Sequence, residues 1–178
     1  LDYLNNTKFD YCCFLDDDCF IKNNFILNHL KFIKAYKCSI VTGPQIYKSK
    51  KPFFKVFERN FAHGSKILWA STNNVFFKKK ILKNKIFFSD KVSKYGYGED
   101  QLFFSKMSKK GEIIRWNQNP VYEISQKKRE NLRWYIDRNL KYGLTGMLID
   151  QELHNFLVAY ILNILKAFNN LLLTVIYL

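Results

Sequence analysis

Apolar runs and helical periodicity divide the first part of the chain into a strand, a helix and a second strand. Residues 11–15 form a continuous apolar run that is typical of a core strand, and residues 21–36 carry apolar side chains at helical spacing. A second apolar run, residues 39–42, ends at the breakers Gly43 and Pro44. A crossover of this length favours parallel strands, so we expect both strands to end at the same edge of one sheet.

The rest of the chain continues with short strands and two helices. Residues 67–70, 75–77, 112–116 and 121–124 are strand candidates, and residues 71–74 form a polar turn. One helix is expected to start at Glu99 and end near Gly111, and a longer one to cover residues 128–142 and stop at Gly143. We therefore predict an α/β fold over residues 1–145, with a mixed, mainly parallel sheet flanked by helices.

Residues 156–178 are mostly apolar, and Lys166 carries the only charge among them. The segment is long enough to cross a bilayer, but Asn163, Asn169 and Asn170 interrupt it. A helix in the membrane interface, a hydrophobic hairpin and a helix packed on another part of the protein remain open. We assign residues 146–178 to a hydrophobic helical tail, and we expect it to hold the protein on the cytoplasmic face of the membrane.

Composition limits the classes of protein that fit. With 178 residues, of which 48% are hydrophobic, the chain can bury one sizeable core. A net charge of +14 is typical of proteins that bind nucleic acid, a membrane surface or a phosphorylated substrate, although an AT-rich genome also produces abundant Lys. The four Cys residues show no CxxC spacing, which argues against zinc. Adjacent Cys12 and Cys13 on a strand point to opposite faces, which is typical of small core residues in a reducing compartment. Because the chain starts with Leu and a core strand, we expect a truncated N-terminus.

Three consecutive carboxylates, Asp16, Asp17 and Asp18, directly follow the first predicted strand. Adjacent carboxylates repel one another, and a bound cation offsets this cost. Their hard oxygen ligands favour Mg²⁺ or Mn²⁺, and such ions often complete their shell with substrate phosphates. The carboxyl end of a strand in an open α/β sheet is also where ligands bind. A solvated acidic turn is the alternative interpretation of the triplet.

Glu99 and Asp100 begin a predicted helix directly after the aromatic, glycine-containing loop 95–98. The positive end of a helix favours an ionised carboxylate, and a general base must be ionised before it accepts a proton. Capping of the helix is the alternative interpretation, and it uses the same physics.

The helix predicted over residues 128–142 carries a basic and aromatic stripe. Arg129, Arg133, Trp134 and Arg138 lie on successive turns of it. Because Lys is the common cation of this chain, a cluster of Arg suggests planar, bidentate contacts with phosphate. A charged surface with one buried Trp is the alternative interpretation.

The order of these motifs resembles the family 2 glycosyltransferases of the GT-A type, especially the subgroup similar to the succinoglycan-biosynthesis enzymes. The resemblance covers about residues 10 to 143 and depends on the ordered set rather than on any single motif. The motifs that carry it are the acidic triplet, Gly43-Pro44, the turn 71–74, the basic run 78–80, Gly98-Glu99-Asp100 and the basic, aromatic helix.

The resemblance implies an inverting transfer of a sugar from a nucleotide-diphosphate donor to a hydroxyl of a glycan or lipid-linked acceptor in polysaccharide biosynthesis. It implies that Asp18 and Asp16 bind Mg²⁺ or Mn²⁺, and that Asp100, with Glu99 beside it, is the base. The strand and acidic residue that hold the nucleoside in this family have no counterpart here, so we expect these residues alone not to transfer sugar. Donor- or acceptor-binding roles are implied for Asp16, Asp17, Asn73, Asn74, Arg129, Arg133, Trp134 and Arg138.

A basic module that binds nucleic acid and an inactive, membrane-associated scaffold of the same fold are the alternative functions. The first leaves the ordered carboxylates unexplained, so we expect no nucleic-acid partner.

Overall fold

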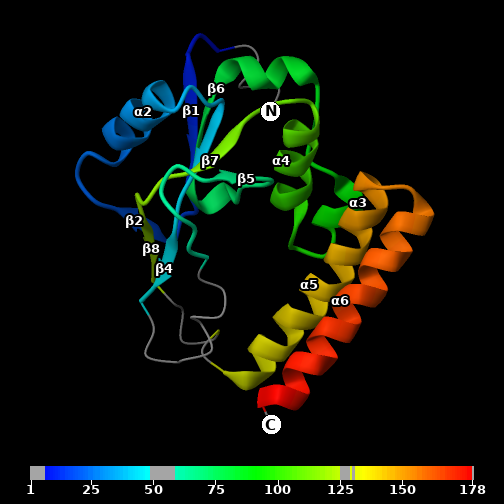
Figure 1. The fold of residues 1–178 in the computed structure, drawn as a ribbon. Helices are drawn as coiled ribbons and strands as arrows, with labels where there is room; N and C mark the ends of the chain where they lie inside the picture. The colour runs from blue at the N-terminus through cyan, green and yellow to red at the C-terminus, as the bar shows by residue number, and fades with distance from the viewer. Residues whose placement is uncertain (1–6, 49–58, 125–128, 130, 178) are drawn as a thin grey trace.

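A computed structural model describes residues 7–48, 59–124, 129 and 131–177 of the chain. These residues form two β-sheets surrounded by helices, which confirms the α/β class (Figure 1). The strand order of the five-stranded sheet is β1 (Tyr11–Phe14), β6 (Val75–Lys78), β3 (Ile40–Thr42), β7 (Ile114–Trp116) and β5 (Lys66–Ile67). The strand order of the three-stranded sheet is β2 (Cys19–Ile21), β8 (Val121–Glu123) and β4 (Gln45–Tyr47).

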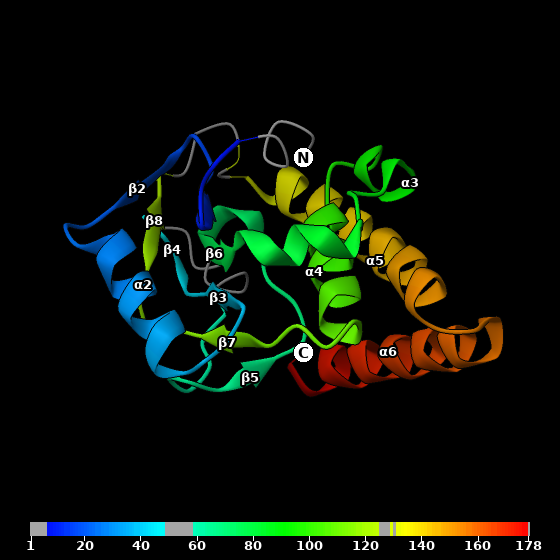
Figure 2. The same cartoon turned by 90° about the horizontal axis from the view of Figure 1, so that it is seen from above.

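Helices lie on both sides of the five-stranded sheet (Figure 2). One side is covered by α2 (Phe25–Ala35) and the other by α4 (Glu99–Lys109). The short helix α3 (Asp90–Ser93) and the long helices α5 (Leu132–Leu153) and α6 (Phe156–Tyr177) follow on the α4 side. Two 3₁₀ segments, η2 (Thr72–Asn74) and η3 (Lys79–Asn84), flank β6.

Alternation of side chains along β3 and β6 divides the core into two layers. Ile40 and Phe77 pack in the cluster that contains Phe103 and Phe104 of α4. Their neighbours Val41 and Phe76 point to the opposite face and pack with Phe32 and Ile33 of α2. Successive side chains point to opposite faces because a strand is pleated. Both faces of these strands are apolar because helices cover both of them.

The pairing of the strands corrects the prediction of a mainly parallel sheet. Among the described strands, β3 and β7 are parallel, as are β4 and β8, whereas the other four pairings are antiparallel. The strands β1 and β3 run in the same direction, but β6 lies between them and is antiparallel to both. Apolar runs identify a strand but not its partner, because β6 comes from much later in the chain.

Three polar links carry the chain from the five-stranded sheet into the three-stranded sheet. The acidic triplet joins β1 to β2, Gly43-Pro44 joins β3 to β4, and residues 117–120 join β7 to β8. Asn74 connects the second and third of these links by hydrogen bonds. Its side-chain amide donates to the carbonyl oxygens of Pro44 and Asn119, both at 3.0 Å. The expected convergence of the acidic triplet and Gly43 at one sheet edge is therefore present.

The helix α5 corrects the predicted end of the basic, aromatic helix. It continues through Gly143 to Leu153, and so also crosses the domain boundary that we placed after residue 145. Ile149 packs with Val92 of α3 and Leu102 of α4. A mid-helix glycine costs only about 1 kcal/mol relative to alanine, so tertiary packing of this face outweighs it.

The C-terminal segment forms α6, which packs alongside α5 (Figure 1, Figure 2). Lys166 of α6 forms an ion pair with the mostly buried Asp150 of α5 at 2.5 Å. Within the described part of the chain, no helix has the length and apolar character needed to cross a membrane.

We expect Gly43→Ala to destabilise the fold, because an added Cβ would lie 2.6 Å from the Asn117 carbonyl oxygen and 2.7 Å from that of Asn119. Overpacking against backbone typically costs about 1–3 kcal/mol. Gly146→Ala is the matched control: nothing lies within 4 Å of its added Cβ, and the site is helical. Thermal unfolding should show a lower melting temperature for the first variant and an equal or higher one for the second; equal losses in both would contradict this packing.

Candidate active site

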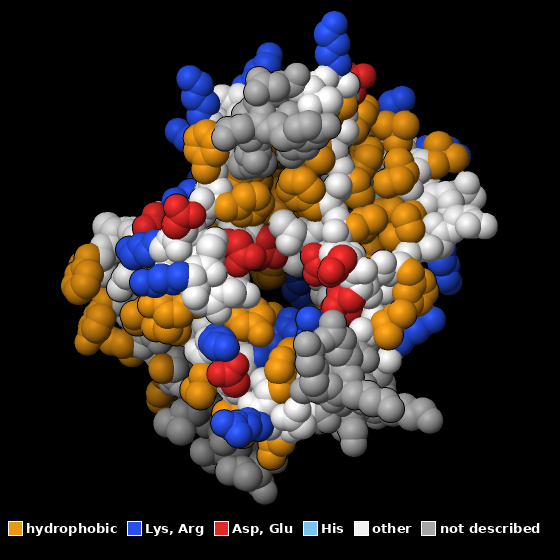
Figure 3. Space-filling view, turned by 180° about the vertical axis from the view of Figure 1, so that it is seen from behind, with side chains coloured by type: hydrophobic (Ala, Val, Ile, Leu, Met, Phe, Trp, Pro, Cys, Tyr) orange, Lys and Arg blue, Asp and Glu red, His pale blue; other side chains and the backbone are white. Residues whose placement is uncertain are grey.

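A cavity of about 640 Å³ lies where the acidic triplet, η2, the start of α4 and the helix α5 meet. Figure 3 shows the hollow, with acidic side chains on both sides of it and basic side chains inside. Most of the residues predicted from the sequence line it, namely Asp16, Asp17, Asp18, Asn73, Glu99, Asp100, Arg129, Trp134 and Arg138.

Two predicted site residues do not reach this cavity. Asn74 is fully buried, and its side chain holds the links between the sheets, as described above. Arg133 lies on an exposed position of α5. The adjacent residues Asn73 and Trp134 take the inward positions instead, because successive residues of a helical turn point in different directions.

The acidic triplet places carboxylates close enough for a cation to bridge them. Carboxylate oxygens of Asp16 and Asp18 and the sulfur of Cys19 all lie within 4.8 Å of one another. Desolvation, with repulsion from Asp18, Asp100 and Asp17, raises the pKa of Asp16. A hard divalent cation fits the two carboxylates and would relieve this repulsion. The sulfur of Cys19 is softer and suits such an ion less well. Burial, together with repulsion from Asp16, raises the pKa of Cys19 to about 12.

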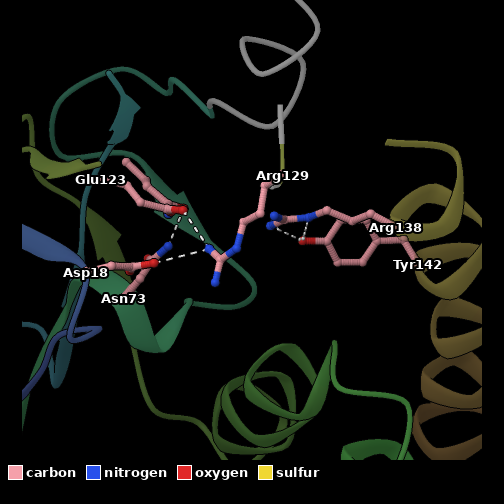
Figure 4. A network of polar contacts seen from close by, with 7 residues as sticks. Asp18, Asn73, Glu123, Arg129, Arg138 and Tyr142 are labelled. Carbon is pink, nitrogen blue, oxygen red and sulfur yellow. Dashed lines mark hydrogen bonds and ion pairs between the residues drawn. The ribbon is translucent and has the colours of Figure 1, made fainter. Parts of the chain in front are cut away.

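Arg129 balances the negative charge at this end of the cavity (Figure 4). Its guanidinium donates to Asp18 at 3.1 Å and to Glu123 at 3.2 Å. Glu123 is only 4% exposed, so its carboxylate depends on that cation. Desolvation, together with the charge of Asp18, raises the pKa of Glu123, whereas Arg129 and Arg138 lower it.

Glu123 also fixes the orientation of Asn73 through one intermediate side chain. The amide nitrogen of Gln45 donates to Glu123, and the amide oxygen of Gln45 accepts from the side chain of Asn73. Asn73 is thereby left with its amide oxygen as an acceptor for a ligand. The chain of contacts connects the acidic end of the cavity to the turn formed by η2.

The carboxylate of Asp100 is held at the first turn of α4. Gly98 precedes this helix with a φ of 87°, which favours glycine, and the helix dipole favours a negative charge there. Ser71 donates its hydroxyl to Asp100 Oδ2 at 2.8 Å, and the backbone N–H of Thr72 donates to the same oxygen at 3.3 Å. The start of the helix is where the sequence predicted it, and these contacts join it to η2.

A wall of aromatic and basic side chains faces this carboxylate from α5. The guanidinium of Arg138 donates to the hydroxyl of Tyr142 at 3.0 and 2.7 Å, and it lies over the rings of Tyr97, Trp134 and Tyr142. Figure 4 shows Arg138 and Tyr142 on the opposite side of the cavity from Asp18 and Glu123.

Several lining residues escaped the sequence interpretation. Glu123 belongs to the predicted strand 121–124, and Ser71 belongs to the predicted polar turn 71–74, but neither was given a role in the site. Arg59 could have been found, because Arg is rare in this Lys-rich chain. The other lining residues to which the sequence interpretation gave no site role are Gln45, Tyr47, Trp69, Thr72, Gly96, Tyr97, Gly98, Gln101 and Tyr142.

Comparisons with known proteins show the fold of this chain and no closer relationship. No family model and no curated protein match it. Among solved structures it is similar to TarS from S. aureus, a glycosyltransferase, with a TM-score of 0.54 and 17% identity, over 85% of this chain and 26% of that one. The fold is therefore glycosyltransferase-like.

Two structures of TarS residues 1–349 were determined with nucleotides. The complex with UDP matches at a TM-score of 0.52 and 15% identity, over 85% of this chain and 43% of that one. The complex with UDP-GlcNAc matches at a TM-score of 0.50 and 15% identity, over 88% of this chain and 50% of that one. The present chain thus spans half or less of the length of these proteins.

We expect Glu99→Gln to raise the melting temperature at pH 7. One carboxylate oxygen of Glu99 is buried without a hydrogen-bond partner among the described residues, and desolvation raises the pKa of this group. The folded state then binds the proton more tightly than the unfolded state. At a pH above the raised pKa, the ionised Glu99 carboxylate therefore lowers the free energy of unfolding. In unfolding scans the advantage of the variant should vanish as the pH falls below the ordinary value of 4.5.

Glu152→Gln is the matched variant of opposite sign. Hydrogen bonding from Lys106 lowers the pKa of Glu152, so its carboxylate stabilises the fold at neutral pH and loses that effect as the pH falls through the lowered pKa. This variant should melt below the wild type at pH 7. A pH-independent difference for Glu99→Gln would contradict the cost assigned to Glu99.

Proposed function

We propose that the cavity transfers a sugar from a nucleotide-diphosphate donor to a hydroxyl of a glycan or lipid-linked acceptor. The observation that carries the proposal is the presence of two separate carboxylate groups in one cavity. Asp16 and Asp18 lie at one end beside Arg129, and Asp100 lies at the start of α4, held by Ser71. A glycosyltransferase-like fold is consistent with this division of roles.

The acidic end is suited to the diphosphate of the donor. Asp18 and Asp16 would hold Mg²⁺ or Mn²⁺, which would neutralise charge on the departing nucleoside diphosphate. Arg129 and Arg138 offer planar guanidinium groups that match phosphate oxygens. Arg129 now lies between two carboxylates, so its contact with a diphosphate would replace its contact with Asp18 or Glu123.

Asp100 is proposed to act as the general base. The acceptor oxygen attacks the anomeric carbon while its proton passes to the carboxylate, and the bond from carbon to the diphosphate oxygen breaks with its electron pair. This single displacement inverts the anomeric centre. Oδ1 of Asp100 accepts only the backbone N–H of Gln101 among the described residues, at 2.7 Å, so it retains a lone pair for the proton.

We expect Asp100→Asn to lower the turnover of the full-length protein by about 10²–10⁴-fold, because the amide cannot accept the proton. Affinity for the nucleotide-sugar should change little. Asp90→Asn is the matched control, since Asp90 occupies the first turn of α3, is exposed and lies outside the cavity. Initial rates with nucleotide-sugar and acceptor measure the effect, and near-normal turnover of Asp100→Asn would reduce Asp100 to a helix cap.

Attachment to an anionic membrane surface is a second part of the proposal. The helix α6 exposes large apolar side chains to solvent: Phe156 is 77% exposed, Leu157 66% and Phe168 65%. An apolar helix face on a chain of charge +14 is favourable for binding at the interface of an anionic bilayer. Lipid-linked acceptors would then be within reach of the cavity.

We expect the protein to float with vesicles that contain anionic lipid. The double variant Phe156→Ser with Leu157→Ser should bind them less, because it removes two exposed apolar side chains. Ile26→Ser is a control, since Ile26 is an exposed apolar residue of α2, on the other side of the sheet. Wild-type protein that stays in the soluble fraction would contradict membrane attachment.

A further inference from the structure

Arg59 differs from the other arginines that line the cavity in what it contacts. Arg129 pairs with Asp18 and Glu123, and Arg138 donates to Tyr142. No hydrogen bond or ion pair of Arg59 occurs among the residues that the structure describes. Its guanidinium carbon instead lies 3.7 Å from the centre of the Trp69 ring.

Stacking on Trp69 leaves the edge of the guanidinium available. A guanidinium has five N–H donors in its plane, and a ring above that plane occupies only the face. Trp116 lies farther away, with its ring centre 5.8 Å from the guanidinium carbon. Arg59 is therefore oriented by an aromatic face while its in-plane donors have no described partner, which is the arrangement that bidentate binding of an anion requires.

The choice of residue type points in the same direction. The chain contains 29 Lys and Arg, of which only Arg59, Arg115, Arg129, Arg133 and Arg138 are Arg. Three of these five line the cavity, whereas no Lys is among its described lining residues. A cavity that only needed positive charge would be expected to use Lys in such a chain, so the planar shape of the guanidinium matters here.

Arg59 lies on the side of the cavity that holds the proposed base, because it stacks on Trp69, and Trp69 lies two residues before Ser71, whose hydroxyl donates to Asp100. Among acidic groups, Asp100 is the one whose charge most affects it: burial lowers the pKa of Arg59, and Asp100 opposes this. The tyrosines Tyr142 and Tyr47 are its other electrostatic neighbours. The acidic triplet and Glu123, in contrast, are balanced by Arg129.

We propose, on the basis of the proposed function, that Arg59 binds an anionic group of the acceptor, a phosphate or a carboxylate close to the hydroxyl that is glycosylated. The acceptor hydroxyl must contact Asp100, so the part of the acceptor next to it lies beside Arg59. The carboxylates that line the cavity would repel an anionic acceptor in the absence of a local cation. Arg59 supplies that cation, and the anionic group of the acceptor would accept hydrogen bonds from the guanidinium of Arg59.

The test compares three small probes in calorimetric titrations of the full-length protein, with Mn²⁺ and UDP present at saturation. Glucose 6-phosphate, glucuronate and glucose differ in the anionic group and share the sugar ring. We expect the wild type to bind at least one of the charged probes about tenfold or more tightly than glucose, as a charge-assisted hydrogen bond allows. Arg59→Gln should lose this preference, and Arg59→Lys should keep part of it.

Lys31→Gln is the charge-matched control, because Lys31 is exposed on α2 and outside the cavity. It should retain the preference, and all variants should show cooperative thermal unfolding. Equal binding of all three probes by the wild type would overturn the inference, as would unchanged preference in Arg59→Gln. A loss of UDP affinity in Arg59→Gln would assign Arg59 to the donor diphosphate instead. Failure of the wild type to bind UDP would overturn the proposed function itself.

Discussion

The accumulation of negative charge around one cavity is the constraint on which the rest of this structure depends. Six acidic side chains line it, and one of them, Glu123, is almost completely buried. Such a cluster is stable only where cations and hydrogen-bond donors are placed against it. Arg129 contributes the cation at the triplet, and Ser71 and the helix dipole of α4 stabilise Asp100. A divalent cation held by Asp16 and Asp18 would complete this balance.

The three-stranded sheet explains how the chain holds the charged side chains of the cavity so close together. Each of the three polar links leaves the five-stranded sheet at the same edge, and the three-stranded sheet fixes their far ends. Gly43 allows two links to approach within a distance that a side chain would prevent. Glu123 is the last residue of β8, the strand that follows the third link, and its carboxylate contacts Gln45 and, through it, Asn73.

Local sequence signals predicted the position of a residue well where it belongs to a turn or a helix start. The triplet after β1 and the start of α4 at Glu99 are examples, because apolar runs and glycines mark both places. Strand partners were not predictable, since β6 enters between β1 and β3 from a distant part of the chain. Both members of two neighbouring pairs were predicted to line the site, but only Asn73 and Trp134 do so, whereas Asn74 and Arg133 do not. Only the tertiary fold decides which residue of each pair faces inward.

The most direct test of the account is a calorimetric titration of UDP with and without Mn²⁺. The full-length wild type, Asp18→Asn and the double variant Lys80→Gln with Lys83→Gln should be compared, because both lysines line a second cavity of about 650 Å³ beside β1. We predict that Mn²⁺ strengthens UDP binding to the wild type and to the lysine variant, and that Asp18→Asn loses this effect. Metal-dependent binding that survives in Asp18→Asn but disappears in the lysine variant would contradict the account and place the nucleotide at the other cavity.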